Sequence, residues 1–426
     1  VLDFKNSTFV SDMPEVAISN VDLSSSEIQI RQQFTFNVSG NRATITITST
    51  NEFFDTFDEE RYNIAYSDGS IQTLREENLV FTADRKAVTL VQLSKASDTD
   101  AIFLGTIRRT EVTSQKKILQ RCSQLVINRS QQSGSGTAQN TLADGLTTSS
   151  VYGTRVQDKE ICLNVPDGVR VLGIYESSTA GDPNLPSISL INRSAELTDT
   201  IQGELVVGET SGATARVVSK AAATVKIVYT NDIRFDREEI ATFQSSGIVG
   251  QVSVVLEGDK NTSKSFRFDN GQRDEFYDLA RIIRKEGEPA PSKRLAVIFD
   301  HYKVEGEIGD FASVNSYSPE NFEFDMPTYR RRALSDYVDA RPRVADYNTS
   351  SGTSPFDYDT RSFTVSGSKP PVIVGDDVVT LGYSHYLARI DKVYLTKDGF
   401  FELKKGAPAP VGDVSAPSDP SGAFSV

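Results

Sequence analysis

Short runs of alternating apolar and polar residues recur along this chain, and they constrain its fold more than any other feature. Examples are 43–50 (ATITITST), 87–93 (AVTLVQL) and 101–107 (AIFLGTI). In the first run, Ile45 and Ile47 fall on one face and threonines on the other. Because side chains alternate between the two faces of a strand, such β-branched runs between turn residues indicate β-strands. We therefore predict a mainly β, multidomain protein.

The N-terminal part, residues 1–118, is predicted to form an antiparallel β-sandwich. An Asp-Gly pair at 68–69 lies between strand-like runs and is typical of a tight hairpin. Residues 119–199 are predicted to be a linker followed by the start of a central mixed β domain. The Gly-, Ser- and Thr-rich stretch 131–148 is interpreted as the linker. Strands are expected at 161–165 and 169–175.

Residues 200–256 are predicted to form a small inserted β-barrel, because short strands there are separated by Gly203, Gly208 and Gly212. Hairpins are expected around 219–224 and within 242–255. A phosphate-binding loop would require GxxxxGK[ST] leading into a helix. The glycine-rich loop 208–213 leads instead into a strand-like run, which argues against phosphate binding.

The rest of the central β domain is expected at 257–410, with one or two short helices. The spacing of apolar residues predicts a helix over 274–285, and short helical character around 334–338. A buried strand is expected at 294–302 and a hairpin turn at 397–399. The Gly-, Pro- and Ser-rich tail, 411–426, is predicted to be an extended linker.

Composition narrows the function classes. The chain has 426 residues, a net charge of −13, two cysteines and two histidines. The acidic charge argues against a nucleic-acid partner, and no apolar run approaches the ~20 residues that span a bilayer. We predict that Cys122 and Cys162 are reduced and buried, and we expect no metal site, no cofactor and no membrane insertion.

The segment 295–344 holds most of the residues that could perform chemistry. A hydrolase triad could be composed of Asp300, His301 and Asp310 with Ser313 or Ser316, but no GxSxG motif is present. We interpret His301 as a buried or interfacial hydrogen-bonding residue.

Acid pairs could cleave glycosides or bind calcium, but the sequence has 58 acids, so chance pairs are expected. The candidate acids for glycoside cleavage are Glu305, Glu307, Asp310, Glu320, Glu323 and Asp325. For calcium, Asp376, Asp377 and the acids of 357–359 supply oxygen ligands, but their spacing does not match a calcium loop.

Five arginines lie within 14 positions, Arg330, Arg331, Arg332, Arg341 and Arg343. Asp336, Asp339 and Asp346 alternate with them, so bidentate Arg–Asp pairs that fix an irregular segment are a better interpretation than phosphate contacts. The structural set that we predict is Asp300, His301, Asp336, Asp339, Arg341 and Arg343, with no catalytic residue among them.

Several phrases resemble large structural proteins in the tails of contractile-tailed phages, especially the T4-like phages of cyanobacteria. They are VYGTRVQDKEICLNVPD (151–167), FDNGQRDEFYDLARIIRK (268–285), FDHY to GDFASVNSY (299–317), DARPRV (339–344) and SHYLARIDKVYLTKDGFFELKKGAPA (384–409). The stretch GETSGATARV (208–217) is similar to a short barrel insert of phage tail proteins.

The resemblance implies a non-enzymatic component of the virion tail, made in the host cytoplasm. It would be a baseplate wedge subunit or a connector of fibres to the baseplate, with other tail subunits in repeated copies as partners. Two alternatives stay open. A receptor- or glycan-binding fibre module would expose aromatic platforms, for which Tyr317, Tyr329, Tyr347 and Tyr358 are candidates. A polysaccharide-degrading tail enzyme would require a pair of catalytic acids.

Overall fold

Strands make up 49% of the protein and helices 5% in the computed structural model. The structure describes residues 2–3, 9–129, 152–305, 309–321, 325–349, 354–363, 372–373, 378–422 and 424–425. Within these ranges the helices are short 3-10 turns: η1 (Glu76–Asn78), η2 (Leu197–Asp199), η3 (Ser263–Ser265), η4 (Val314–Ser316), η5 (Pro319–Asn321), η6 (Leu334–Asp336) and η7 (Tyr358–Thr360). The predicted mainly β, multidomain fold is confirmed. The linker predicted at 131–148 lies outside the described residues.

The N-terminal part consists of two antiparallel sheets around one apolar core that includes Ile45, Val88 and Phe103. One sheet has the order β1-β28-β3-β10-β6-β7, with β27 on β3 and β5 on β10, and the other has the order β4-β9-β8. The strands are β1 (Leu2–Asp3), β3 (Ile18–Ser39), β4 (Ala43–Thr46), β5 (Glu52–Phe54), β6 (Asn63–Ala65), β7 (Ile71–Thr73), β8 (Leu79–Phe81), β9 (Ala87–Leu90), β10 (Ser97–Thr110), β27 (Val372–Ile373) and β28 (Val378–His385). The predicted runs are β4, β9 and part of β10, and β6 and β7 form the predicted hairpin.

The central part also has two sheets, ordered β11-β23-β13-β20 and β12-β22-β21. Their strands are β11 (Lys116–Ile127), β12 (Glu160–Pro166), β13 (Gly168–Glu176), β20 (Lys260–Asn261), β21 (Phe266–Asp269), β22 (Leu279–Arg284) and β23 (Leu295–Glu305). Both strands expected before residue 176 are present as β12 and β13, and β23 is the predicted buried strand. Ile161, Ile282 and Val297 lie in the core between the sheets.

The helix predicted over 274–285 is wrong: 274–278 are irregular, and β22 occupies 279–284. Ile282 is paired with Ile161 of β12 on one side and with Phe268 of β21 on the other. The apolar residues that fit a helical spacing fit a buried strand equally well over so short a run. The neighbouring strands decide between the two, since a strand between β12 and β21 satisfies the backbone groups of both.

A closed barrel of six strands follows the order β14-β17-β16-β15-β18-β19. The strands are β14 (Ser187–Ile191), β15 (Leu205–Gly208), β16 (Thr214–Lys220), β17 (Thr224–Tyr229), β18 (Ile240–Phe243) and β19 (Val249–Leu256). Both predicted hairpins are present. The barrel begins before residue 200, because β14 pairs with both β17 and β19 and thereby closes the sheet.

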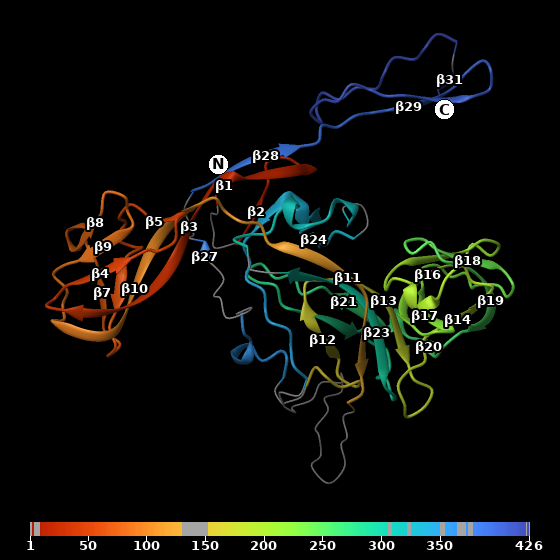
Figure 1. The fold of residues 1–426 in the computed structure, drawn as a ribbon, viewed down its shortest axis with the longest axis horizontal. Coiled ribbons are helices and arrows are strands. Elements are labelled where there is room, and N and C mark those ends of the chain that lie inside the picture. Colours follow the sequence, from red (N-terminus) through yellow and green to blue (C-terminus); the bar gives the residue numbers. More distant parts are fainter. Residues whose placement is uncertain are drawn as a thin grey trace.

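The irregular segments 309–321 and 325–349 pack between the N-terminal and central parts (Figure 1). They contain β24 (Thr328–Tyr329), β25 (Arg332–Ala333) and β26 (Tyr337–Asp339), and β26 pairs with β2 (Val10–Asp12) near the chain start. Arg330 and Arg331 form the turn between β24 and β25, both with positive φ. Of the helical character expected at 334–338, the first three residues form η6 and the last two are strand.

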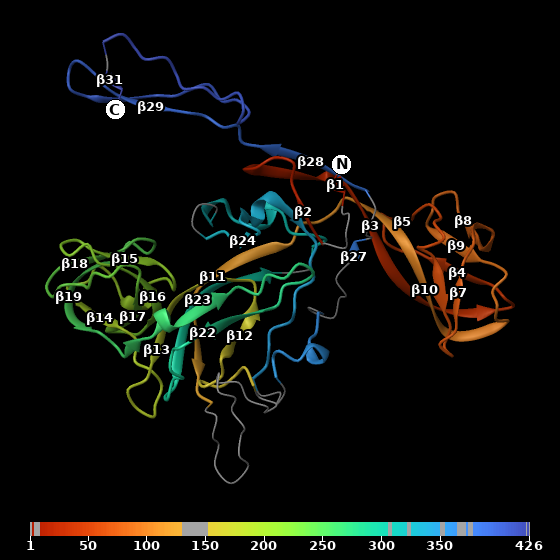
Figure 2. The ribbon, with the colours of Figure 1, turned by 180° about the vertical axis from the view of Figure 1, so that it is seen from behind.

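The C-terminal part is a three-stranded sheet that projects from the end of β28, away from the sandwich and, in the view of Figure 1, above the barrel (Figures 1 and 2). It has the order β30-β29-β31, from β29 (Lys392–Leu395), β30 (Phe401–Lys404) and β31 (Phe424–Ser425). The predicted hairpin at 397–399 joins β29 to β30. The extended linker predicted for 411–426 is wrong, because β31 returns to pair with β29.

Candidate functional site

Arg341 and Asp339 form a bidentate ion pair that is buried. Nε of Arg341 lies 2.9 Å from Oδ1 of Asp339, and Nη2 lies 2.6 Å from Oδ2. The guanidinium also lies between two rings, 4.3 Å from the centre of Tyr277 and 4.6 Å from that of Tyr329. Burial acts to raise the pKa of Asp339, but the charge and hydrogen bonds of Arg341 lower it. This carboxylate is held ionised and is not available as a proton donor.

Lys117 extends this pair into a buried network. Its Nζ donates to Asp167 Oδ2 at 2.9 Å, to the hydroxyl of Tyr277 at 2.9 Å and to that of Tyr317 at 3.1 Å. Tyr277 in turn donates to Asp339. Burial lowers the pKa of Lys117 and raises the pKa of both tyrosines well above the usual value. The network contains two positive and two negative groups, so the charges cancel inside the protein.

A second network surrounds Asp300 on β23. Its Oδ1 accepts the backbone N–H of Cys122 at 2.7 Å, at a bulge where the pairing of β11 with β23 shifts and where Cys122 has positive φ. Arg170 of β13 donates to Asp300 at 2.9 Å and to Asp325 at 2.5 Å. Arg121 binds Asp325 at 2.6 Å. These contacts fix three strands of the central sheet and the chain segment that covers it.

His301 is mostly buried next to this network. Burial, followed by the charge of Arg343, lowers the pKa of its imidazole. Its Nδ1 has no hydrogen-bond partner among the described residues. The triad candidates do not assemble around it: Asp310 pairs with Arg109, and Ser313 caps η4. The hydroxyl of Ser316 lies 2.7 Å from that of Ser114.

The other predicted structural residues lie apart from the buried pair. Asp336 accepts the backbone N–H of Ile18 at 3.2 Å. Arg343 lies 3.8 Å from the exposed carboxylate of Asp346. Arg330 pairs with Asp274 at 3.2 Å on the surface. Among the five arginines of the cluster, Arg341 is therefore the one that forms a fully buried ion pair within the residues that the structure describes.

Three of the acids considered for glycoside cleavage, Glu305, Asp310 and Asp325, are paired with bases, and Glu320 is exposed. Glu305 binds Lys116 at 2.7 Å on the surface, and Asp325 binds two arginines. Glu307 and Glu323 lie outside the described residues, as do Asp376 and Asp377. Asp357 accepts the N–H of Asp359 at the start of η7. Across the part of the chain that the structure describes, no group of three or more His, Cys, Asp or Glu side chains could hold a metal ion.

Sequence reasoning missed several of the buried charges. Arg155 and Asp158 are a buried pair, with Nη2 3.2 Å from Oδ1. Asp278 binds Arg281 at 2.6 Å and Arg361 at 3.0 Å. Lys117 lies in a strand with a polar pattern, which indicates an exposed side chain. The local sequence carries no signal for its burial, because Asp167, Tyr277 and Tyr317 come from other segments of the chain.

The glycine-rich loop of the barrel binds an internal anion. Oε2 of Glu239 accepts the backbone N–H groups of Thr210 and Ser211, at 3.2 and 3.0 Å. The hydroxyl of Ser211 also lies 2.9 Å from Oε1. The N–H groups of this loop are therefore satisfied by a carboxylate of the barrel itself.

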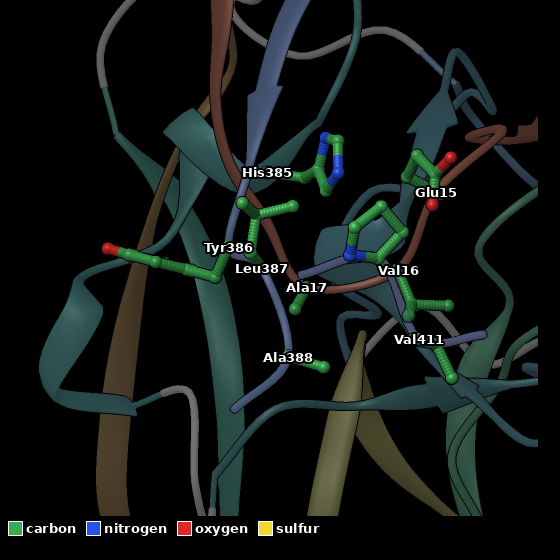
Figure 3. A pocket seen from close by; sticks show the side chains of 9 residues that line it. Glu15, Val16, Ala17, His385, Tyr386, Leu387, Ala388 and Val411 are labelled. Carbon is green, nitrogen blue, oxygen red and sulfur yellow. The ribbon is translucent and has the colours of Figure 1, made fainter. Parts of the chain in front are cut away.

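Small hollows occur where the C-terminal part meets the body and near Arg273. The first, of about 170 Å³, is lined by Glu15, Val16, Ala17, His385, Tyr386, Leu387, Ala388, Pro410 and Val411. In Figure 3 the apolar side chains of Val16 and Val411 lie below Glu15 and His385, and the ring of Tyr386 points away from them. The second, of about 310 Å³, is a surface depression along 272–276.

Of the tyrosines considered as glycan platforms, Tyr317 and Tyr329 are buried, so they cannot stack on a sugar. Tyr358 is exposed beside Phe276 and Phe363.

No model of a protein family matches the chain, and no curated protein or solved structure is significantly similar to it. None of the helices in the described ranges has the length and apolarity needed to cross a membrane.

Proposed function

We propose that this protein is a non-enzymatic structural subunit of a phage tail, either a baseplate wedge component or a connector of fibres to the baseplate. The observation that carries the non-enzymatic part is the state of the charged residues in 295–344. Asp300, Asp325 and Asp339 each bind an arginine, and Asp310 binds Arg109. Groups held this way fix strands and loops in place.

The placement in a tail is supported by the phrases that resemble tail proteins. Two of them take part in the buried networks: DARPRV contains the Asp339–Arg341 pair, and FDHY contains Asp300. A rigid body with buried ion pairs suits a subunit that transmits force between neighbours. The partners would be other tail subunits, present in repeated copies.

A receptor- or glycan-binding module is the second candidate, and the exposed Tyr358 beside two phenylalanines is the feature that favours it. Aromatic side chains at a surface can stack on the apolar face of a sugar. Two of the four candidate tyrosines are buried, which leaves this alternative with less support.

A cryo-EM reconstruction of the intact particle tests the proposal. We expect the barrel and the β11-β23-β13-β20 sheet to fit density in the baseplate or at the fibre attachment, in copies related by the symmetry of the tail. Density in the capsid shell would overturn the tail placement. Specific glycan binding by the purified chain, abolished by Tyr358→Ala, would favour the second candidate. Turnover of host polysaccharide would overturn the non-enzymatic assignment.

A further inference from the structure

The C-terminal sheet has one face composed entirely of apolar residues. Residues directly opposite each other on neighbouring antiparallel strands point to the same face. Val393 lies opposite Leu403, and Leu395 lies opposite both Phe401 and Phe424. Val393 and Leu395 are two positions apart and therefore share a face. These five residues, which we call the apolar face, span all three strands.

The apolar face is open to solvent. The exposed fractions are 42% for Val393, 37% for Leu395, 68% for Phe401, 58% for Leu403 and 75% for Phe424. Both views of the molecule show the sheet projecting clear of the body (Figures 1 and 2). Scattered exposed apolar residues are ordinary, but a contiguous group on one sheet face marks an interaction site.

The opposite face of the same sheet is already covered by the chain. Tyr394 is buried there, with its hydroxyl 3.2 Å from Oδ1 of Asp419. Lys392 binds the same carboxylate at 2.6 Å, and Lys404 binds the carbonyl of Ser418 at 2.6 Å. The tail therefore forms the second layer on one side only, and the apolar face lacks the layer that a stable sheet requires.

We propose that the apolar face binds the same face of a second copy of this chain, and that the two sheets form a two-layer sandwich. A two-fold axis makes such a contact self-complementary, since each residue of the face meets the same set of residues in the other copy. Face-to-face packing of twisted sheets is an ordinary solution for burying apolar side chains.

Charge favours a second copy as the occupant. The chain carries a net charge of −13, but residues 386–426 contain five basic and five acidic residues and are neutral. All of the net negative charge therefore lies in the body. Two copies that meet through the projecting sheets keep their acidic bodies apart. Salt screens the repulsion between charges that are more than about 10 Å apart, so the bodies would repel each other little.

The available area also suits a dimer. A standard protein–protein interface buries about 800 Å² on each partner. Aromatic side chains contribute about 150–250 Å² each when fully buried. Phe401, Phe424 and the three aliphatic residues of the face together offer an area below this standard size, within the range of weak interfaces. This indicates a dimer of low affinity that does not depend on charge pairs.

Sedimentation equilibrium of the whole chain tests the proposal. The chain has a mass of 46.7 kDa, and we expect a dimer at about 100 µM that is not weakened by added salt. Phe401→Glu and Leu403→Glu place charges at exposed positions of the face and should weaken the dimer by about 100-fold or more. Glu402→Gln alters the opposite face of the same strand and is the matched control.

A wild-type chain that stays monomeric at the highest concentration would overturn the proposal. Equal weakening of the dimer by the face variants and by the control would also overturn it. Circular dichroism and melting of each variant establish that it is folded. Because the measurement uses the isolated chain, a failed dimer leaves the tail assignment untouched, and a capsid location found in the particle would leave the dimer untouched.

Discussion

Lys117 and Asp167 form an ion pair closed off from solvent, with Nζ 2.9 Å from Oδ2 and both side chains about fully buried. The pair joins β11 to the turn between β12 and β13, and through Tyr277 it reaches the Asp339–Arg341 pair. Segments that are far apart in the sequence thus meet at one buried group of charges. This relationship is the basis for the first two predictions.

Replacing Lys117 by Met should lower the free energy of unfolding by about 3–5 kcal/mol, because the charge of Asp167 is left buried without its partner. Urea denaturation followed by circular dichroism measures the change. Lys116→Met is the control in the same strand, since Lys116 pairs with Glu305 on the surface. An exposed pair contributes at most about 1 kcal/mol. Equal effects of the two variants would contradict the prediction.

Arg341→Ala should destabilise the protein by about 3–5 kcal/mol, because the bidentate partner of the buried Asp339 is lost. Arg343→Ala is a matched control two residues away, where the partner carboxylate is exposed and 3.8 Å distant. It should change stability by less than about 1 kcal/mol. If Arg341→Ala leaves thermal melting unchanged, the structural role of the pair is wrong.

The stability contribution of Asp325 should depend on pH. Burial acts to raise the pKa of this carboxyl, but Arg121 and Arg170 lower it below the usual 3.8. An acid whose pKa is depressed on folding stabilises the protein above its unfolded value and loses this contribution as the pH falls through the folded value. Stability should therefore differ most between wild type and Asp325→Asn above about pH 5. The difference should shrink towards pH 2, which denaturation at several pH values can measure; a constant difference would rule out this account.

Gly271→Ala should destabilise more than Gly399→Ala, although both glycines have a φ of +82°. Positive φ costs a non-glycine residue about 1–2 kcal/mol at either site. A Cβ at Gly271 would lie 2.1 Å from the carbonyl oxygen of Asp278, whereas one at Gly399 meets nothing within 4 Å. The clash should add about 1–3 kcal/mol. Melting temperatures of the two variants give the comparison, and equal losses would refute it.

Cys122 and Cys162 are free and buried, as predicted. Burial raises the pKa of each thiol to about 12. The thiolate is the reactive form, so both groups should react slowly with a thiol reagent in the native protein at pH 8 and rapidly in denaturant. A colorimetric thiol assay measures both rates. Fast reaction of either cysteine in the native protein would contradict its buried placement.

Local patterns predicted the elements that depend on nearby residues. The run at 43–50 alternates and contains β4, and the mainly apolar run at 294–302 forms most of β23. The turns at 68–69 and 397–399 contain Asp-Gly and join the expected hairpins. These features are encoded within a few residues, because side-chain alternation and turn geometry are local properties.

Long-range pairing decided the rest. Residues 279–284 fit a helix by spacing, but they form β22 because β12 and β21 supply its hydrogen-bond partners. The burial of Lys117 depends on Asp167, Tyr277 and Tyr317, each of which lies on another segment. The apolar face appears only when the register of β29, β30 and β31 is known. No local pattern contains these contacts, since each requires chain segments distant in sequence to be fixed side by side.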